Sequence, residues 1–288
     1  MAAKKSASSR KRDARPATRF VEVTERNAVA IVVLNRPDVH NAFNGEVIAE
    51  LTATFAALDA DNDVRAVVIA GTGKSFCAGA DLNWMKEIAG YSRAQNLADA
   101  QALAAMLRTL NGLAKPTIAR VHGAAMGGGV GLVACCDIAI AAQEATFALS
   151  EAKLGLIPAT ISPYVVDAIG TRYARRYFLT AERFDAAEAY RIGLVHDLVQ
   201  QTELDARINE LLGALLVAGP QAQTECKALI RNVSHRPIDA QVIAGTARNI
   251  ADVRASPEGK EGVAAFLGKR KAAWVPPAPP RVPNAGEE

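Results

Sequence analysis

Short apolar runs alternate with longer amphipathic stretches through the first two thirds of the chain. The apolar runs are rich in Val, Ile and Ala, and they lie at 21–23, 28–34, 66–70, 117–121, 137–141 and 146–148. Runs of this length and composition predict strands. A helix is expected at about 45–58, where apolar residues recur at helical spacing. Strands that alternate with helices favour an α/β layer arrangement.

The last third of the chain has a different pattern. From about Leu204 the strand signals fade, and helical patterns dominate through Arg270. Ser256, followed by Pro257 and Glu258, suits the start of the last helix, because Ser caps a helix N-terminus and Pro fits its first turn. Helices with apolar faces need a partner surface, so this region indicates an assembly of several chains.

A glycine-rich segment lies in the apolar stretch 117–158, which has few polar side chains. Gly127, Gly128 and Gly129 open a short helix expected over 130–136. Residues without a Cβ let a ligand touch bare backbone. The N–H groups at a helix start are unpaired and carry partial positive charge. The pattern predicts that backbone donors face a ligand here.

A second glycine-rich turn, SFCAGAD at 75–81, follows the apolar run 66–70. Each of the two turns can supply one N–H group. Two donors aimed at one oxygen form an oxyanion hole, in which each donor is worth about 3 kcal/mol to the transition state. The two turns are therefore expected to act together.

Glu151 has mostly apolar neighbours, which are Leu149, Ala152, Leu154, Leu156 and Ile157. Desolvation among such residues would push the pKa of Glu151 upward, toward the range where a carboxyl both takes and gives a proton. An isolated glutamate at such a position is otherwise interpreted as a solvated residue at a strand end. The nearby glycine turns favour the catalytic interpretation.

Five segments in order along 20–274 resemble the crotonase superfamily, the enoyl-CoA hydratases and isomerases. They are LNRP with NA at 34–42, SFCAGADL at 75–82, the stretch 119–137, FALSEAKLGLIP at 147–158 and EGVAAFLGKRKAAW at 261–274. The resemblance implies an α/β spiral of ββα units with a C-terminal helical trimerisation region. It places the oxyanion donors on the backbones of Ala80 and Gly128, and one of two catalytic glutamates on Glu151.

The second family glutamate falls on Gly131, so half of the usual hydratase pair is missing. In the two-carboxylate scheme both glutamates hold the attacking water. With Gly131 in place, Glu151 must act alone or with another polar group. The alternative is an enoyl-CoA isomerase, which needs one base beside a thioester enolate. The segment 158–164 replaces a run of glycines found in many relatives, and it is expected to reshape the acyl pocket.

Three segments, GADLNWMK at 79–86, GGGVGLVACCDIAIA at 127–141 and LSEAKLGLIPATISPY at 149–164, are similar to bacterial methylglutaconyl-CoA hydratases. The similarity implies a hydratase of leucine breakdown that adds water to a branched enoyl thioester with a distal carboxylate. CoA is then part of the substrate, without a metal or redox cofactor. The resemblance also predicts a homotrimer or a dimer of trimers. Its implied CoA contacts are Ala78, Asp81 and Leu82 in one subunit, and Phe266 and Lys269 from a neighbour.

Two other classes of protein remain as alternatives. Gly129, Gly131 and Ala134 fit G-x-G-x-x-A, with Glu151 as an acidic residue further on, which is a weak signal for a dinucleotide site. The other alternative is a non-catalytic homologue that binds CoA or RNA. It draws on the segment 1–19, which has seven basic residues and one acidic residue and is expected to be disordered.

Composition agrees with an enzyme of one main domain, since 50% of the 288 residues are hydrophobic and 22% are charged. We expect a basic tail (1–19), a spiral core (20–203), a helical region (204–274) and a Pro-rich tail (275–288). The sequence has neither a secretory apolar core nor an apolar run long enough to span a membrane, which predicts a cytoplasmic protein. The spacing of its four cysteines predicts reduced thiols.

Overall fold

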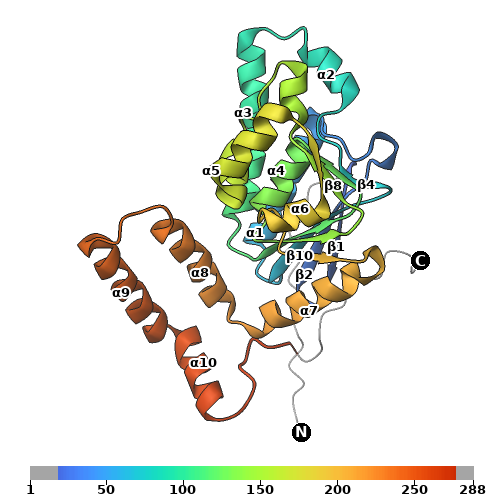
Figure 1. Ribbon diagram of the computed structural model, residues 1–288. Coiled ribbons are helices and arrows are strands. Elements are labelled where there is room, and N and C mark those ends of the chain that lie inside the picture. Colours follow the sequence, from blue (N-terminus) through green and yellow to red (C-terminus); the bar gives the residue numbers. More distant parts are fainter. Residues whose placement is uncertain (1–18, 277–288) are drawn as a thin grey trace.

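The computed structural model describes residues 19–276 (Figure 1). The basic segment expected at 1–19 and the Pro-rich segment expected at 275–288 therefore lie outside the described residues, except for Arg19, Val275 and Pro276.

The chain forms two sheets whose strands are mostly parallel. The larger sheet has six strands in the order β1 (Val21–Arg26), β2 (Val29–Leu34), β3 (Ala66–Gly71), β5 (Thr117–Val121), β7 (Ile138–Ala142) and β10 (Asp197–Val199). The smaller sheet has the order β4 (Ser75–Cys77), β6 (Ala124–Met126), β8 (Thr146–Ala148) and β9 (Arg183–Asp185). Only the β1–β2 and β8–β9 pairs are antiparallel within these ladders.

A repeated connection joins the two sheets. Each of β3, β5 and β7 is followed by a short strand of the smaller sheet and then by a helical segment. After β4 and β6 the helices lead back to the larger sheet, at β5 and β7, whereas α5 leads to β9 of the smaller sheet. These helices are α3 (Arg93–Gly112), α4 (Gly128–Cys135) and α5 (Ser162–Thr180), while α1 (Gly45–Ala60) follows the first hairpin. Figure 1 shows them stacked against the sheets. The expected α/β spiral of ββα units is confirmed.

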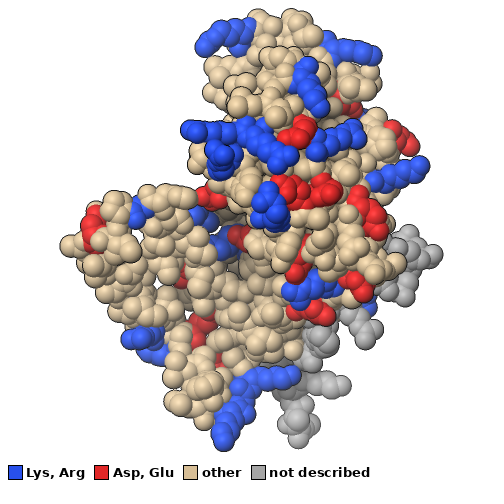
Figure 2. All heavy atoms as spheres, viewed as in Figure 1, with Lys and Arg blue, Asp and Glu red and all other residues tan. Residues whose placement is uncertain are grey.

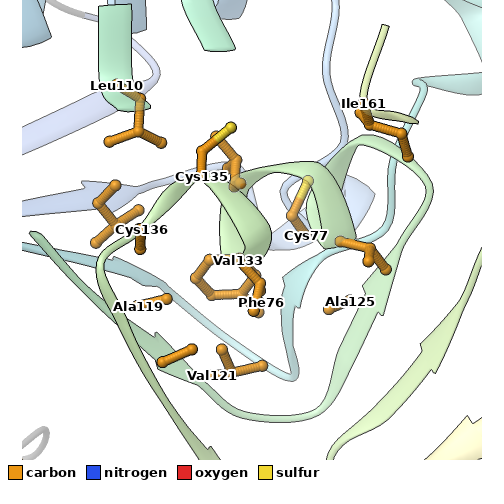
Figure 3. Packing of buried hydrophobic residues seen from close by; sticks show 14 of the residues in the cluster. Phe76, Cys77, Leu110, Ala119, Val121, Ala125, Val133, Cys135, Cys136 and Ile161 are labelled. Atoms are coloured by element: carbon orange, nitrogen blue, oxygen red, sulfur yellow. The ribbon is translucent and has the colours of Figure 1, made fainter. Parts of the chain in front are cut away.

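Helix α4 lies at the centre of the main core. Six of its residues are buried, and Figure 3 shows it surrounded by side chains from both sheets and from neighbouring helices, including Phe76, Ala119, Leu110 and Ile161. The opposite face of the larger sheet is covered by α7 (Leu204–Val217). Its buried residues recur at helical spacing, and they are Leu204, Ile208, Leu212 and Leu216.

Several smaller elements complete the described chain. They are the helices α2 (Leu82–Ile88) and α6 (Ala186–Arg191) and the 3₁₀ turns η1 (Pro37–Val39), η2 (Ser150–Leu154) and η3 (Gln201–Glu203). Within residues 19–276, none of the helices has the length and apolar character needed to span a lipid bilayer.

The observed elements differ from the expected ones at several ends, and they include four short strands that were not expected. Helix α4 begins at Gly128, two residues before the expected start at 130. Glycine is a poor helix former, so the sequence pattern placed the start too late, while packing in the core fixes the first turn. The strands β4, β6, β9 and β10 have only three residues each, which is too short for a hydrophobic period to reveal.

Three helices form a C-terminal arm that stands away from the body in Figure 1: α8 (Pro220–Val233), α9 (Ala240–Ala255) and α10 (Pro257–Leu267). Helix α10 starts as predicted, with Pro257 in its first turn and the Ser256 hydroxyl accepting the Gly259 N–H at 3.0 Å. In this part of the structure no residue of α8 or α9 is fully buried. Large apolar side chains are exposed along the arm, including Ile230, Ile243, Val263 and Phe266.

A polar network at the amino ends of β5 and β7 anchors the arm to the body. The Asp137 carboxylate accepts the Thr117 N–H and hydroxyl, each at 2.8 Å, and the Lys227 ammonium at 2.6 Å. Lys227 belongs to α8, and it also donates to the Lys115 carbonyl at 3.0 Å. Its side chain is only 10% exposed, so the ion pair is largely shielded from water. One carboxylate therefore joins β5, β7 and α8.

We expect Asp137→Ala to lower the free energy of unfolding by about 2 kcal/mol, because a shielded ammonium and a strand N–H lose their common acceptor. Urea denaturation measures this as a lower midpoint with an unchanged m value. The control is Glu210→Ala, which removes an exposed ion pair with Arg207 and should cost less than about 0.5 kcal/mol. Equal losses in the two variants would show that Asp137 has no special anchoring role.

Candidate functional site

The two glycine-rich turns predicted to act together are neighbours in the fold. Strands β4 and β6 pair in parallel, so the turns that follow them both start at the carboxyl ends of these strands, on the same side of the smaller sheet. At Gly79 φ is +86°, and a Cβ there would lie 2.9 Å from the Met126 carbonyl oxygen and 3.8 Å from the Gly128 nitrogen. Glycine at 79 thus allows the two backbones to touch.

The predicted donor groups are free to bind a ligand. The Phe43 N–H donates to the Gly79 carbonyl at 2.6 Å, and the Phe43 carbonyl accepts the Asp81 N–H at 2.8 Å. These two bonds fix the backbone on either side of Ala80. Within residues 19–276, the N–H groups of Ala80 and Gly128 donate to no acceptor in the protein. Gly128 opens α4, where N–H groups lack intrahelical partners.

The Glu151 carboxyl lies against the second turn. Glu151 is in η2, directly after β8, and its Oε1 is 3.0 Å from the point where a Cβ on Gly127 would be. Its Oε2 is buried and has no hydrogen-bond partner within the described chain. Burial raises the pKa of Glu151 above the ordinary value of 4.5. A carboxyl in this state is suited to proton transfer.

The neighbours of Glu151 in sequence supply only part of this burial, since Leu149 is fully buried but others are exposed. Leu154, Leu156 and Ile157, the neighbours in sequence that were expected to desolvate the carboxyl, are 58%, 53% and 76% exposed. The carboxyl is instead shielded from the side of the Gly127 turn, because η2 follows β8 and β8 pairs with β6. The predicted direction of the pKa shift and its cause, desolvation, are both confirmed, although the exposed side chains of Leu154, Leu156 and Ile157 contribute little to it.

The place of the missing second glutamate is filled by an apolar side chain. A Cβ on Gly131 would lie 2.3 Å from Cγ2 of Ile161 and 3.6 Å from Cδ2 of Leu107. Sequence analysis did not identify Ile161 individually as a site residue. It lies in the segment 158–164, where the departure from the family pattern was the available signal.

The predicted CoA-site residues have different surroundings. Ala78 is half-buried, and Leu82 is 75% exposed at the start of α2. Asp81 is buried, caps α2 by accepting the Asn83 N–H, and pairs with Arg36 at 2.9 Å. Burial acts to raise the pKa of Asp81, but these hydrogen bonds hold it below its usual value. The Asp81 carboxylate therefore has a structural partner that the sequence analysis missed.

Phe266 and Lys269 do not join the other site residues within one chain. Phe266 is 82% exposed on α10, and Lys269 lies just beyond that helix, also exposed. Figure 1 shows α10 in the arm, away from α4 and α5.

Other chemistry at the turns is disfavoured by burial and packing. Desolvation raises the pKa of the Cys77 thiol to about 12, so the thiolate needed for a nucleophile does not form at neutral pH. All four cysteines are free thiols, as predicted. The dinucleotide alternative is wrong, since Gly131 is covered by Ile161 and α4 has only eight residues between β6 and β7. No group of His, Cys, Asp and Glu suited to hold a metal occurs in the range 19–276.

The arrangement defines a class of site. Two adjacent turns offer free backbone N–H groups, and beside them stands the Glu151 carboxyl, whose Oε2 is buried and has no hydrogen-bond partner within residues 19–276. Such a site binds a polarised oxygen and moves a proton next to it.

Comparisons with known proteins identify the family. The sequence model of the enoyl-CoA hydratase/isomerase family matches residues 24–276. A crotonyl-CoA hydratase of Syntrophomonas wolfei is 34% identical over 250 residues, covering 86% of this chain and 94% of the relative. A short-chain-enoyl-CoA hydratase of Clostridium acetobutylicum is 32% identical over 257 residues, covering 87% and 95%. The crystal structure of an enoyl-CoA hydratase from Shewanella pealeana superposes with a TM-score of 0.87 at 44% identity, covering 89% and 96%. The chain belongs to the enoyl-CoA hydratase/isomerase family, so the resemblance to the crotonase superfamily is confirmed.

We expect Glu151→Gln to raise the free energy of unfolding at neutral pH. The raised pKa means that the folded protein disfavours the carboxylate, so the native protein loses stability as the pH rises through that pKa, while Gln stays neutral. Below the ordinary glutamate range the carboxyl is protonated in both states, and the gain should vanish. Denaturation of the native protein and the variant, at neutral pH and at a pH below the ordinary glutamate range, measures this gain in stability. The exposed Glu144→Gln variant is the control. A gain independent of pH would contradict the burial of an ionisable carboxyl.

Proposed function

We propose that the protein is an enoyl-CoA hydratase that adds water across the double bond of an enoyl thioester. The observation that carries the proposal is the buried Glu151 carboxyl, without a partner in the described residues, beside two adjacent turns with free N–H groups. Relatives named as enoyl-CoA hydratases cover most of the chain and support the same reaction.

In the proposed mechanism, the thioester carbonyl oxygen binds between the N–H groups of Ala80 and Gly128. Water attacks C3 while Glu151 takes one of its protons, and the electron pair of the double bond moves onto the thioester as an enolate. The N–H groups stabilise the negative charge on oxygen. The enolate then collapses as Glu151 gives the proton to C2. A raised pKa suits Glu151 to both steps.

The finer proposal concerns the acyl group. The segments shared with methylglutaconyl-CoA hydratases support a branched, 3-methylglutaconyl-like substrate and a place in leucine breakdown. A cytoplasmic location stays a prediction.

An enoyl-CoA isomerase is the second candidate, and Gly131 is the observation that favours it. Isomerisation needs one base, which takes a proton from one carbon and returns it to another while the oxyanion donors hold the enolate. The Ile161 methyl meets the point where a Cβ on residue 131 would be, so this position supplies no second carboxylate. A non-catalytic homologue that binds CoA, or RNA through the basic tail, is less well supported because Glu151 and both turns are retained.

For the assembly we propose a homotrimer or a dimer of trimers, in which the arm of one subunit packs on its neighbour. The exposed apolar side chains of the arm support this arrangement, since they need a covering surface. Phe266 and Lys269 would then reach the neighbour's CoA, while Ala78, Asp81 and Leu82 line the CoA site from within. Because its carboxylate is paired with Arg36 and its N–H donates to the Phe43 carbonyl, Asp81 would support the CoA site by fixing the turn before α2.

Hydration is tested with crotonyl-CoA and 3-methylglutaconyl-CoA by loss of enoyl-thioester absorbance and by product mass. We expect a gain of one water mass with both, a higher kcat/KM for the branched substrate, and a kcat about 10²–10⁴-fold lower for Glu151→Gln. A rearranged product without added water would favour the isomerase. A Glu151→Gln variant with the kcat of the native protein would contradict the catalytic role of Glu151.

The assembly is tested by sedimentation, where a trimer has about three times the chain mass of 30.4 kDa.

The proposed contact of Phe266 with the neighbour's CoA is tested by kinetics. We expect Phe266→Ala to raise KM for the thioester several-fold with kcat unchanged, because a contact between this side chain and CoA stabilises the ground state and the transition state alike. Ile238→Ala is the control, since Ile238 is 85% exposed and lies outside α10. A change in kcat alone would contradict a binding role for Phe266.

A further inference from the structure

The main chain of Phe43 holds the turn that carries the first backbone donor. Its N–H donates to the Gly79 carbonyl at 2.6 Å, and its carbonyl accepts the Asp81 N–H at 2.8 Å. Gly79 and Asp81 lie on either side of Ala80, with which Phe43 forms an isolated parallel bridge. A movement of the main chain at Phe43 would therefore move the Ala80 N–H with it.

The ring of Phe43 lies against the second donor. A Cβ on Gly128 would be 2.8 Å from Cε2 and 2.9 Å from Cδ2 of this ring. Both separations are shorter than normal carbon contacts of about 3.5–4.0 Å, so the ring packs on the bare backbone at the start of α4. Phe43 thus contacts the chain at both donors, through its main chain at Ala80 and through its ring at Gly128.

Phe43 is itself held on both sides along the chain. Before it, the buried Asn41 has a φ of +57°, and its side-chain nitrogen donates to the Thr72 and Ser75 carbonyls at 2.8 Å each. After it, Asn44 caps α1 with its side chain. Phe43 is only 2% exposed, so its ring is enclosed in a close-packed interior and keeps a fixed position.

We propose that Phe43 is a positioning residue that sets the spacing between the N–H groups of Ala80 and Gly128. This inference rests on the proposed function, in which both N–H groups bind the thioester carbonyl oxygen. Each donor must lie about 2.7–3.1 Å from the developing oxyanion to stabilise it. Phe43 does not touch the substrate in this scheme, but it fixes one turn relative to the other.

The spacing is tested by a measurement that needs no turnover, the infrared carbonyl stretch of bound butyryl-CoA with an isotope label at the thioester carbon. Hydrogen bonds to a carbonyl lower this frequency, so we expect a downward shift when the ligand binds the native protein. Phe43→Leu lacks Cε2, the ring atom nearest to a Cβ on Gly128, and should give a smaller shift. Phe43→Met has an unbranched chain as long as the path to Cε2, and it should keep most of the shift.

Kinetics with crotonyl-CoA give a second readout. For Phe43→Leu we expect kcat to fall about tenfold, less than the roughly 10²–10³-fold loss for removal of a whole donor, because both donors remain but one is misplaced. KM should change less than about threefold, since the spacing matters most where charge develops in the transition state.

The control is Phe55→Leu. Phe55 is a fully buried ring further along α1, so this substitution should lower the melting temperature about as much as Phe43→Leu does. It should leave the carbonyl shift and kcat unchanged. Equal effects of the two substitutions on the carbonyl shift would reduce the role of Phe43 to that of any core residue.

The outcomes separate this inference from the proposed function. A native protein that does not bind butyryl-CoA, or binds it without a carbonyl shift, overturns both. A native shift that Phe43→Leu retains in full overturns the role of Phe43 and leaves the proposed function intact. A native shift that is reduced in Phe43→Leu and kept in Phe55→Leu supports the positioning role, even if the native protein hydrates no enoyl thioester and the proposed reaction fails.

Discussion

The site depends on the close approach of bare backbone at two turns. Gly79 lies against the Met126 carbonyl, and a Cβ on Gly129 would come within 2.3 Å of the Cys77 carbonyl oxygen. Side chains at these positions would push the turn after β4 away from the start of α4. The free N–H groups of Ala80 and Gly128 would then no longer face the same region. Parallel pairing of β4, β6 and β8 makes the approach possible, because it brings the carboxyl ends of all three strands to the same side of the smaller sheet.

The burial of the Glu151 carboxyl lowers the stability of the folded protein. The strand β8 delivers it to the same side of the smaller sheet, where one carboxylate oxygen is buried without a partner in the described chain. A buried polar group without a hydrogen bond destabilises the folded state, and an ionised one does so more strongly. This cost is consistent with a functional role. A solvated glutamate would keep an ordinary pKa and an ion-paired one would have a lowered pKa, so either would be mostly ionised and a weaker proton donor near neutral pH.

The replacement of a glutamate by Gly131 is a change in packing as well as in chemistry. Loss of a side chain from a buried helix would normally leave a cavity, but Ile161 occupies the space. Restoring a glutamate at 131 would therefore require a change at 161 too. The arm shows the opposite situation, because its apolar side chains are exposed in a single chain and lack the covering that the core provides.

The sequence by itself determined five strands of the larger sheet, the strand β8, the helix α1, the positions of the glycine turns, Glu151 and the start of α10. These features follow from local periodicity, from capping residues and from motifs that are contiguous in the chain. Tertiary structure alone decided which turns touch, what shields Glu151 and what fills the space beside Gly131. Ile161 lies 30 residues from Gly131 along the chain, and no local pattern records their contact. Such contacts arise only when the fold places distant segments side by side, here the helices α4 and α5, so their distances and burial are properties of the folded chain.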